Sequence, residues 1–205
     1  MKKFILMLLV FPMVNIAAAQ GTKNFFSDVK VNLSVGLSYS QCDKKFSSQK
    51  FGISLAVDAQ KPIAHFPNEA STIYGLVGLH FDQKGGKTSS DVSTIGNRSA
   101  NISAGHIKIP VRGGFSYQFK KCSLFFDLGP YVSFMTNSEG ENDINFSSTE
   151  FGIGSMLGIK FKRFAISFGV DRGLTNFATY RRAGEEIKMI NTTSHIDLRW
   201  TLGKK

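Results

Sequence analysis

Four histidines and one short serine–histidine–aspartate arrangement are the residues of this chain whose types suggest chemistry. His80, His106 and His195 lie in segments where apolar and polar residues alternate, on the polar side of the alternation. Ser194, His195 and Asp197 supply the residue types of a serine hydrolase. Because successive residues of a strand point to opposite faces, Ser194 is directed away from the His195 ring. Asp197 shares the face of His195, so the sequence predicts an ion pair there rather than a catalytic triad.

The remaining motifs lack the spacing that catalysis or metal binding requires. His65 belongs to a predicted turn, and the spacing of the other histidines shows no convergence on one metal ion. The run Lys84-Gly85-Gly86-Lys87 is too short for a phosphate-binding loop and lacks the strand–loop–helix context. The sequence therefore predicts no catalytic residue, no metal site, no cofactor and no enzymatic activity.

Long β-strands are the elements that must position these side chains, because apolar residues recur at every second position in eight segments. Strands of soluble proteins average about five or six residues, whereas a strand that crosses a membrane needs about 9–11 residues. Eight is also the smallest strand number of bacterial outer-membrane barrels. The predicted strands are Val29–Tyr39, Phe51–Gln60, Thr72–Asp82, Ser103–Phe119, Cys122–Met135, Glu150–Phe161, Phe164–Gly173 and Thr193–Leu202.

The links between these segments differ in length. Tight turns are predicted at Lys120-Lys121 and at Lys162-Arg163, and the link at residues 61–71 is intermediate. Short turns at one end and long loops at the other are typical of outer-membrane barrels, in which the short turns face the periplasm. The predicted fold is all-β, an eight-stranded antiparallel up-and-down transmembrane β-barrel. The longer links are rich in Ser, Asn, Gly and Thr and cover residues 41–50, 83–102, 136–148 and 174–192.

The polar face of the predicted strands carries charges of both signs and many glycines, which suits the narrow interior of an eight-stranded barrel. Mixed charges can form pairs there, as buried charges must. Aromatic residues collect near the strand ends, as in the girdles of membrane barrels. The predicted inward polar residues, which would form a structural network, are Lys30, Asp58, His80, Asp82, His106, Lys108, Arg112, Asp127, Lys160, Asp171, Asp197 and Arg199.

Two prolines and two cysteines test this topology. Pro110 and Pro130 lie inside predicted strands, where a proline indicates a bulge or a strand break. Cys42 lies in the first long loop and Cys122 at a short turn, on opposite rims of the barrel. Their separation exceeds the roughly 7 Å between Cα atoms that a disulfide allows, so no bridge between them is predicted.

The first residues of the chain read as an export signal. Lys2 and Lys3 precede an apolar run, and the alanines at residues 17–19 supply a cleavage site. We therefore predict a signal peptide at residues 1–19 and an outer-membrane β-barrel domain at residues 20–205.

Short motifs in three segments are similar to those of the small outer-membrane β-barrel proteins of the Bacteroidetes, the group that includes PorT-like proteins. The signal peptide ends in Ala-Ala-Ala-Gln at residues 17–20. His-Ile-Lys-Ile-Pro-Val at residues 106–111 is like the family's hydrophobic Ile-Pro strand, and Val-Asp-Arg-Gly-Leu-Thr-Asn at residues 170–176 is like its Tyr-x-x-Gly-Leu-x-Asn ending. The resemblance covers the whole mature chain. It implies the barrel fold and an outer-membrane location, and it supplies no catalytic residue.

The net charge of +10 points to an anionic partner. The basic residues are spread over turns and strands rather than gathered on one helix, so nucleic-acid binding is not predicted. Outer-membrane lipid is the expected partner, lipopolysaccharide and envelope or secretion proteins are candidates, and a monomer is expected. Basic residues of the long links suit either contacts with lipopolysaccharide phosphates or the solubility of exposed loops. They are Arg181, Arg182, Lys188, Lys84, Lys87 and Arg98.

The sequence thus predicts a non-enzymatic outer-membrane barrel with a structural, adhesion or accessory secretion or envelope role. Two alternatives stay open at this point. One is a soluble lipocalin-like ligand-binding barrel, in which the apolar face would line a cavity. The other is a narrow outer-membrane pore.

Overall fold

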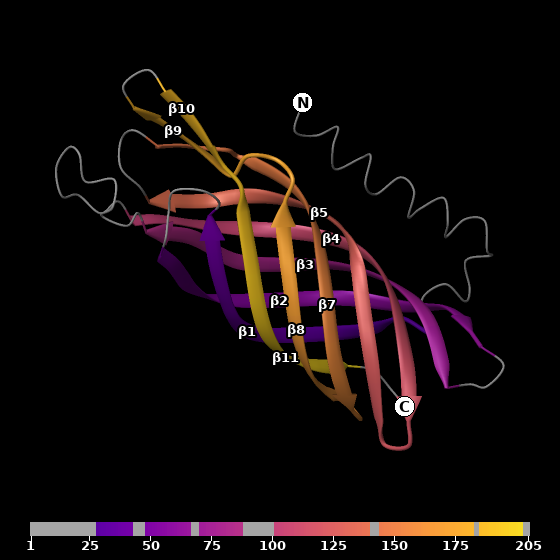
Figure 1. The fold of residues 1–205 in the computed structure, drawn as a ribbon. Helices are drawn as coiled ribbons and strands as arrows, with labels where there is room; N and C mark the ends of the chain where they lie inside the picture. The colour runs from indigo at the N-terminus through magenta and orange to yellow at the C-terminus, as the bar shows by residue number, and fades with distance from the viewer. Residues whose placement is uncertain are drawn as a thin grey trace.

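Eight antiparallel strands close into a barrel in the computed structural model, which describes residues 28–42, 48–66, 70–87, 101–139, 144–182 and 185–202 (Figure 1). Around the barrel the strands follow the order β1-β11-β8-β7-β5-β4-β3-β2, so each pairs with the previous and the next barrel strand in the chain. The pairing of β1 with β11 closes the ring. The strands are β1 (Lys30–Cys42), β2 (Ser48–His65), β3 (Ser71–Lys87), β4 (Asn101–Phe119), β5 (Cys122–Glu139), β7 (Thr149–Phe161), β8 (Phe164–Gly173) and β11 (Asn191–Leu202).

The predicted fold class is confirmed, and all eight predicted strands are present. The bounds of β8 agree with the prediction, whereas several other strands are longer. β3 continues to Lys87 and β5 to Glu139, so the predicted links at 83–102 and 136–148 are too long. The apolar alternation ends near the edge of the apolar belt, but the hydrogen-bonded ladder continues beyond it with polar residues on both faces. His65 closes β2 instead of lying in a turn.

A second, three-stranded sheet lies at the end of the barrel where the long links were predicted. It comprises β6 (Ile144–Phe146), β9 (Ala178–Arg182) and β10 (Glu185–Met189), in the order β10-β9-β6. The prediction that residues 136–148 and 174–192 are only polar loops is therefore wrong, because strands of three and five residues are too short to give a clear apolar alternation in the sequence. We call this the long-loop end. The opposite short-turn end holds the turns at Lys120-Lys121 and Lys162-Arg163 (Figure 1).

Neither proline interrupts its strand. Pro110 pairs with Tyr131, and Pro130 pairs with Ile153. The register of β4 against β5 is the same on both sides of Pro110, and that of β5 against β7 is the same on both sides of Pro130. The predicted bulge or strand break at these positions is therefore wrong.

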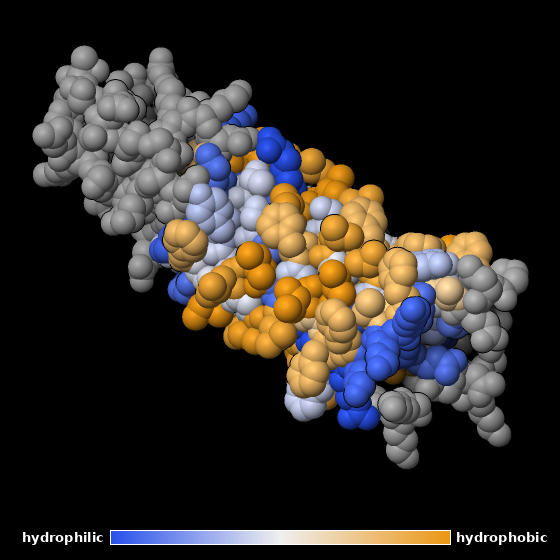
Figure 2. Space-filling view, turned by 60° about the horizontal axis from the view of Figure 1, so that its bottom comes forward, coloured by the Kyte–Doolittle hydropathy of each residue, from blue (hydrophilic) through white to orange (hydrophobic). Residues whose placement is uncertain are grey.

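The outer surface of the barrel is apolar. Large hydrophobic side chains such as Leu37 and Phe168 are more than half exposed, and Figure 2 shows hydrophobic residues gathered around the middle of the barrel with hydrophilic residues toward both ends. Aromatic pairs stand near both ends: Phe164 stacks on Trp200 at 6.2 Å between ring centroids, and Tyr39 meets Phe51 at 5.1 Å. Among the described residues, no helix is long and apolar enough to cross a membrane.

This arrangement contradicts a lipocalin-like barrel, because that fold would direct the apolar face inward to line a cavity. Burying a large apolar side chain stabilises a protein by about 1.5–3 kcal/mol. A complete belt of such side chains on the outside is therefore stable in lipid and unfavourable in water. An apolar outer band with aromatic girdles is the pattern of transmembrane barrels.

Candidate functional site

The interior of the barrel holds a dense network of charged side chains. Of the inward residues predicted from the sequence, Lys30 is exposed and Lys160 is half-buried, both near the short-turn end. All the others are buried inside the barrel: Asp58, His80, Asp82, His106, Lys108, Arg112, Asp127, Asp171, Asp197 and Arg199.

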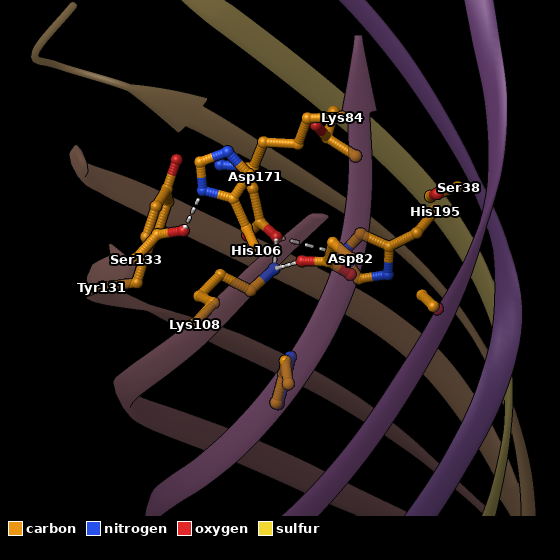
Figure 3. A network of polar contacts seen from close by, with 12 residues as sticks. Ser38, Asp82, Lys84, His106, Lys108, Tyr131, Ser133, Asp171 and His195 are labelled. Carbon is orange, nitrogen blue, oxygen red and sulfur yellow. Dashed lines mark hydrogen bonds and ion pairs between the residues drawn. The ribbon is translucent and has the colours of Figure 1, made fainter. Parts of the chain in front are cut away.

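Lys108 lies at the centre of this network (Figure 3). Its ammonium group forms an ion pair with Asp82 at 2.5 Å and a second one with Asp171. Arg112 reaches the other carboxylate oxygen of Asp171 at 3.0 Å. The lysine comes from β4, Asp82 from β3 and Asp171 from β8, which is not a neighbour of either strand. The ion pairs therefore join opposite walls of the barrel.

The histidine–aspartate pair predicted on β11 is present. His195 Nδ1 lies 2.5 Å from Asp197, and His195 Nε2 lies 3.5 Å from Asp171. The Asp197 carboxylate also accepts a hydrogen bond from Ser54 at 2.5 Å. Ser194 is half-buried on the other face of the strand, as the alternation predicts. His195 is thus linked to two carboxylates, with no serine in the position of a nucleophile among its contacts in the described part of the chain.

A second set of contacts lies nearer the short-turn end. His80 Nε2 lies 2.7 Å from Asp58, and Arg199 approaches Asp58 at 3.7 Å and Asp127 at 3.8 Å. Tyr74, which the sequence analysis did not single out, donates a hydrogen bond to Asp127. No group of three or more potential metal ligands converges among the described residues.

The sequence reasoning misplaced Lys84 and overlooked Glu150. Lys84 was predicted in an exposed loop, but it is 1% exposed, and its ammonium donates to Glu150 at 2.6 Å. Tyr131 donates to the same carboxylate oxygen at 2.7 Å. The prediction is wrong because β3 continues past Asp82 with its even-numbered residues still directed inward. That period was visible in the sequence as His80, Asp82 and Lys84.

The structure places most of the other basic residues that were predicted in the long links. Lys188 is exposed in β10, and Lys87 is the last residue of β3. Arg181 and Arg182 belong to β9. Arg98 lies outside the described residues, as does the predicted signal peptide.

A hydrophobic cap closes the long-loop end above His106. The buried residues of this cap are Cys42, Ala104, Phe177, Ala178 and Met189. The Phe177 ring is fully buried and lies 5.5 Å from the His106 ring. Below the cap, His106 Nδ1 lies 3.0 Å from Ser133 Oγ, and both residues are fully buried. This serine–histidine pair therefore has no surface on which a substrate could bind.

Cys42 belongs to the cap, whereas Cys122 lies beside the short β4–β5 turn. The two cysteines are at opposite ends, as predicted, and no disulfide joins them.

The free space inside the barrel is uneven. Between Ser54, Asp58, His80 and His195 the cavity volume is about 10 Å³, which is room for one water molecule. At the short-turn end a cavity of about 510 Å³ opens, which we call the vestibule. It is bounded toward the interior by Tyr74, Phe125 and Arg199.

Glycine on the inner face allows two neighbouring strands to approach closely at one position. A Cβ atom built on Gly129 would lie 2.7 Å from the Arg112 Cα atom and 3.0 Å from the Val111 carbonyl carbon, both on the backbone of β4. A Cβ atom on Gly113 would meet nothing within 4 Å. Gly129 is therefore required by close packing of two strands.

We expect Gly129→Ala to destabilise the barrel by about 1–3 kcal/mol, since the adjoining backbone must shift. Gly113→Ala is the matched control and should change stability little. The check is the urea midpoint of unfolding in lipid vesicles for both variants. Equal midpoints for the two variants would contradict the packing argument.

Residues 18–179 match the family model described as outer membrane protein beta-barrel domain. The chain belongs to this family. This outer-membrane barrel therefore has lipid around its apolar belt. No curated protein matches its sequence.

Several solved outer-membrane proteins are similar to this chain in structure. OprG of Pseudomonas aeruginosa is 6% identical, with a TM-score of 0.50, over 86% of this chain and 97% of OprG. The outer membrane protease OmpT of Escherichia coli is 10% identical, with a TM-score of 0.43, over 89% of this chain and 99% of OmpT. Ail of Yersinia pestis, in complex with the heparin analogue sucrose octasulfate, is 13% identical, with a TM-score of 0.39, over 85% of this chain and 99% of Ail. At 6% identity the likeness to OprG concerns the fold alone.

Proposed function

We propose that this outer-membrane barrel is a non-conducting, non-enzymatic surface protein that makes adhesive contacts through its long-loop end. The observation that carries this proposal is the construction of that end. The β6-β9-β10 sheet stands beyond the barrel on a buried hydrophobic cap. Loops that only joined strands would need neither a sheet of their own nor a cap.

The orientation in the membrane follows the usual arrangement of such barrels, with short turns in the periplasm and long loops outside. Export through a signal peptide cleaved after Ala19 agrees with that orientation. We further propose membership of the PorT-like branch of Bacteroidetes barrels, on the motifs at residues 106–111 and 170–176.

Catalysis is disfavoured by burial. Among the described residues, the ion-pair partners of His195 are the buried Asp171 and Asp197, and His106 lies under Phe177. A narrow pore is disfavoured by the ion pairs that cross the barrel at Lys108. The interior is better suited to holding the barrel rigid while its outer end binds.

The expected ligand is an anionic surface polymer, and the phosphates of lipopolysaccharide on a neighbouring cell are one candidate. Lys188 is exposed on β10, and the arginines of β9 stand in the same sheet. Basic residues on a projecting sheet would attract such a polymer with a strength that falls as salt rises.

A hairpin replacement tests this proposal. Residues 179–188 are exchanged for Asn-Gly, which leaves Ala178 and Met189 of the cap in place. Bacteria that lack their own adhesins and express the parent chain should adhere to lipopolysaccharide-coated surfaces, and bacteria with the shortened chain should lose most of that adhesion. Heat modifiability on gels confirms that both barrels are folded.

Two outcomes would overturn the proposal. One is equal adhesion by the parent and the shortened chain. The other is a peptide tag inserted between β9 and β10 that antibodies fail to reach on intact cells. Regular conductance steps of the parent chain in planar bilayers would favour the pore instead.

A further inference from the structure

The vestibule at the short-turn end is a space of about 510 Å³. Pockets for small ligands range over about 300–1,000 Å³. The vestibule lies at the end of the barrel opposite to the cap and the β6-β9-β10 sheet. A function of this space is therefore independent of the adhesive role proposed for the long-loop end.

The charged side chains that line the vestibule are predominantly positive, and Arg199 among them is paired with two buried carboxylates, Asp58 and Asp127. Six cationic side chains line it, and no carboxylate stands among the described residues that line it. The cations come from strands on different sides of the barrel and from both short turns, so they surround the opening. They are Lys30, Lys120, Lys121, Lys160, Lys162 and Arg199.

The two turn lysines occupy unfavourable backbone positions. Lys120 has φ of 30° and Lys162 has φ of 56°, the left-handed region in which glycine or asparagine is preferred. Any exposed turn could use glycine there without strain. A lysine at the same position of both turns indicates that a positive charge at this opening has a use.

Hydrogen bonds hold polar side chains in place at the inner part of the vestibule. Lys160 donates to Thr201 at 2.8 Å, and Thr201 donates to Asn32 at 2.7 Å. These bonds fix the Lys160 ammonium on the wall. The side chain of Arg199 is only 4% exposed, and its Nε–H has no hydrogen-bond partner among the described residues.

An aromatic ring and a carboxylate hold the Arg199 guanidinium in place. Its guanidinium lies 5.1 Å from the Phe125 ring centroid and 3.7 Å from Asp58. These contacts stabilise a cation at the inner limit of the vestibule while leaving one donor unused. Guanidinium and ammonium groups together are the usual partners of phosphate oxygens.

We propose that the vestibule binds a phosphate-bearing anion that enters from the short-turn end. Phosphate is favoured because up to six cations face one space, which calls for a ligand of high charge density. The volume exceeds that of a single phosphate ion, so the ligand carries phosphate on a larger group. The group is either a soluble phosphorylated molecule or the headgroup of an anionic phospholipid, because this opening lies at the membrane surface.

The experiment uses the full mature chain in nanodiscs. Two arms distinguish the sources of phosphate: soluble tripolyphosphate titrated by calorimetry into phosphatidylcholine nanodiscs, and retention of phosphatidylglycerol measured by native mass spectrometry. Binding in either arm should weaken at least about tenfold in Lys160→Gln, which corresponds to about 1.4 kcal/mol. It should also weaken with rising salt.

Two further variants keep the test decisive. Lys121→Gln alters an exposed turn and leaves the strands unchanged, so it should fold even where Lys160→Gln does not. Lys188→Gln removes the same charge from the long-loop end and should bind like the parent. Absence of binding in both arms overturns the proposal. So does an equal loss in Lys188→Gln, which would indicate attraction to net charge alone.

Discussion

Replacing Asp171 by alanine is expected to be the most damaging single change in the barrel interior. Asp171 is 1% exposed and forms ion pairs with Lys108, Arg112 and His195. Removing one partner from a buried charge network costs about 3–5 kcal/mol, because the remaining charges stay buried without compensation. Asp171→Ala should therefore lower the free energy of unfolding by at least that amount.

Urea titration of the barrel in lipid vesicles measures this effect. Ser167→Ala is the matched control, because Ser167 lies on the same strand and the same buried face and its hydroxyl has no hydrogen-bond partner among the described residues. It should shift the midpoint little. A loss below about 1 kcal/mol in Asp171→Ala would mean that water enters the interior and solvates the remaining charges.

The interior network explains why sequence reasoning succeeded with the middle of the barrel. A strand that separates lipid from a charged interior must alternate strictly, because a shift by one residue would expose charge to lipid. Asp127 and Asp171 could therefore be placed inward from spacing alone. The partners could not be derived, since the contact of Lys108 with Asp171 depends on how the ring closes.

Prediction from the alternation failed beyond the apolar belt, where lipid no longer requires one face of each strand to be apolar. Lys84 lies on β3 where this strand continues past the apolar belt, so that polar residues occupy both faces and the alternation loses its contrast. Glu150 is the first residue of its predicted strand, and its inward position became apparent only with its partner Lys84. Phe177 and Met189 belong to short apolar stretches, and their burial depends on a sheet that joins the β9–β10 segment to the distant β6. Contacts of that kind leave no periodic signal in the sequence.

His80, His106 and His195 were predicted to be interior residues rather than catalytic ones, and their surroundings support that interpretation. His80 and His195 each lie beside a buried aspartate, and His106 lies between Ser133 and the cap. An eight-stranded barrel is just wide enough for side chains to fill. Pairs of histidine and aspartate help to fill it and are joined by a hydrogen bond in each pair.

Breaking the ion pair of Lys84 with Glu150 is expected to have the second large effect on stability. The pair lies between the interior network and the cap. Both side chains are almost fully buried, at 1% and 0% exposure. Lys84→Met leaves the Glu150 carboxylate with Tyr131 as its remaining donor, and Glu150→Gln leaves the ammonium without its counter-charge. Each single variant should lose about 3–5 kcal/mol.

The double variant distinguishes an ion pair from simple packing. If the cost of each single change comes from the charge left behind, the double variant should lose less unfolding free energy than the two single variants together. This difference, the coupling energy, should be about 1–3 kcal/mol. The double-mutant cycle is measured from urea unfolding in lipid vesicles, and Lys188→Met serves as the control for loss of one exposed lysine at the same end. Additive losses would show that the two residues act separately. Strong coupling would mean that the attraction between the two charges, rather than the packing of each side chain, stabilises this end of the interior.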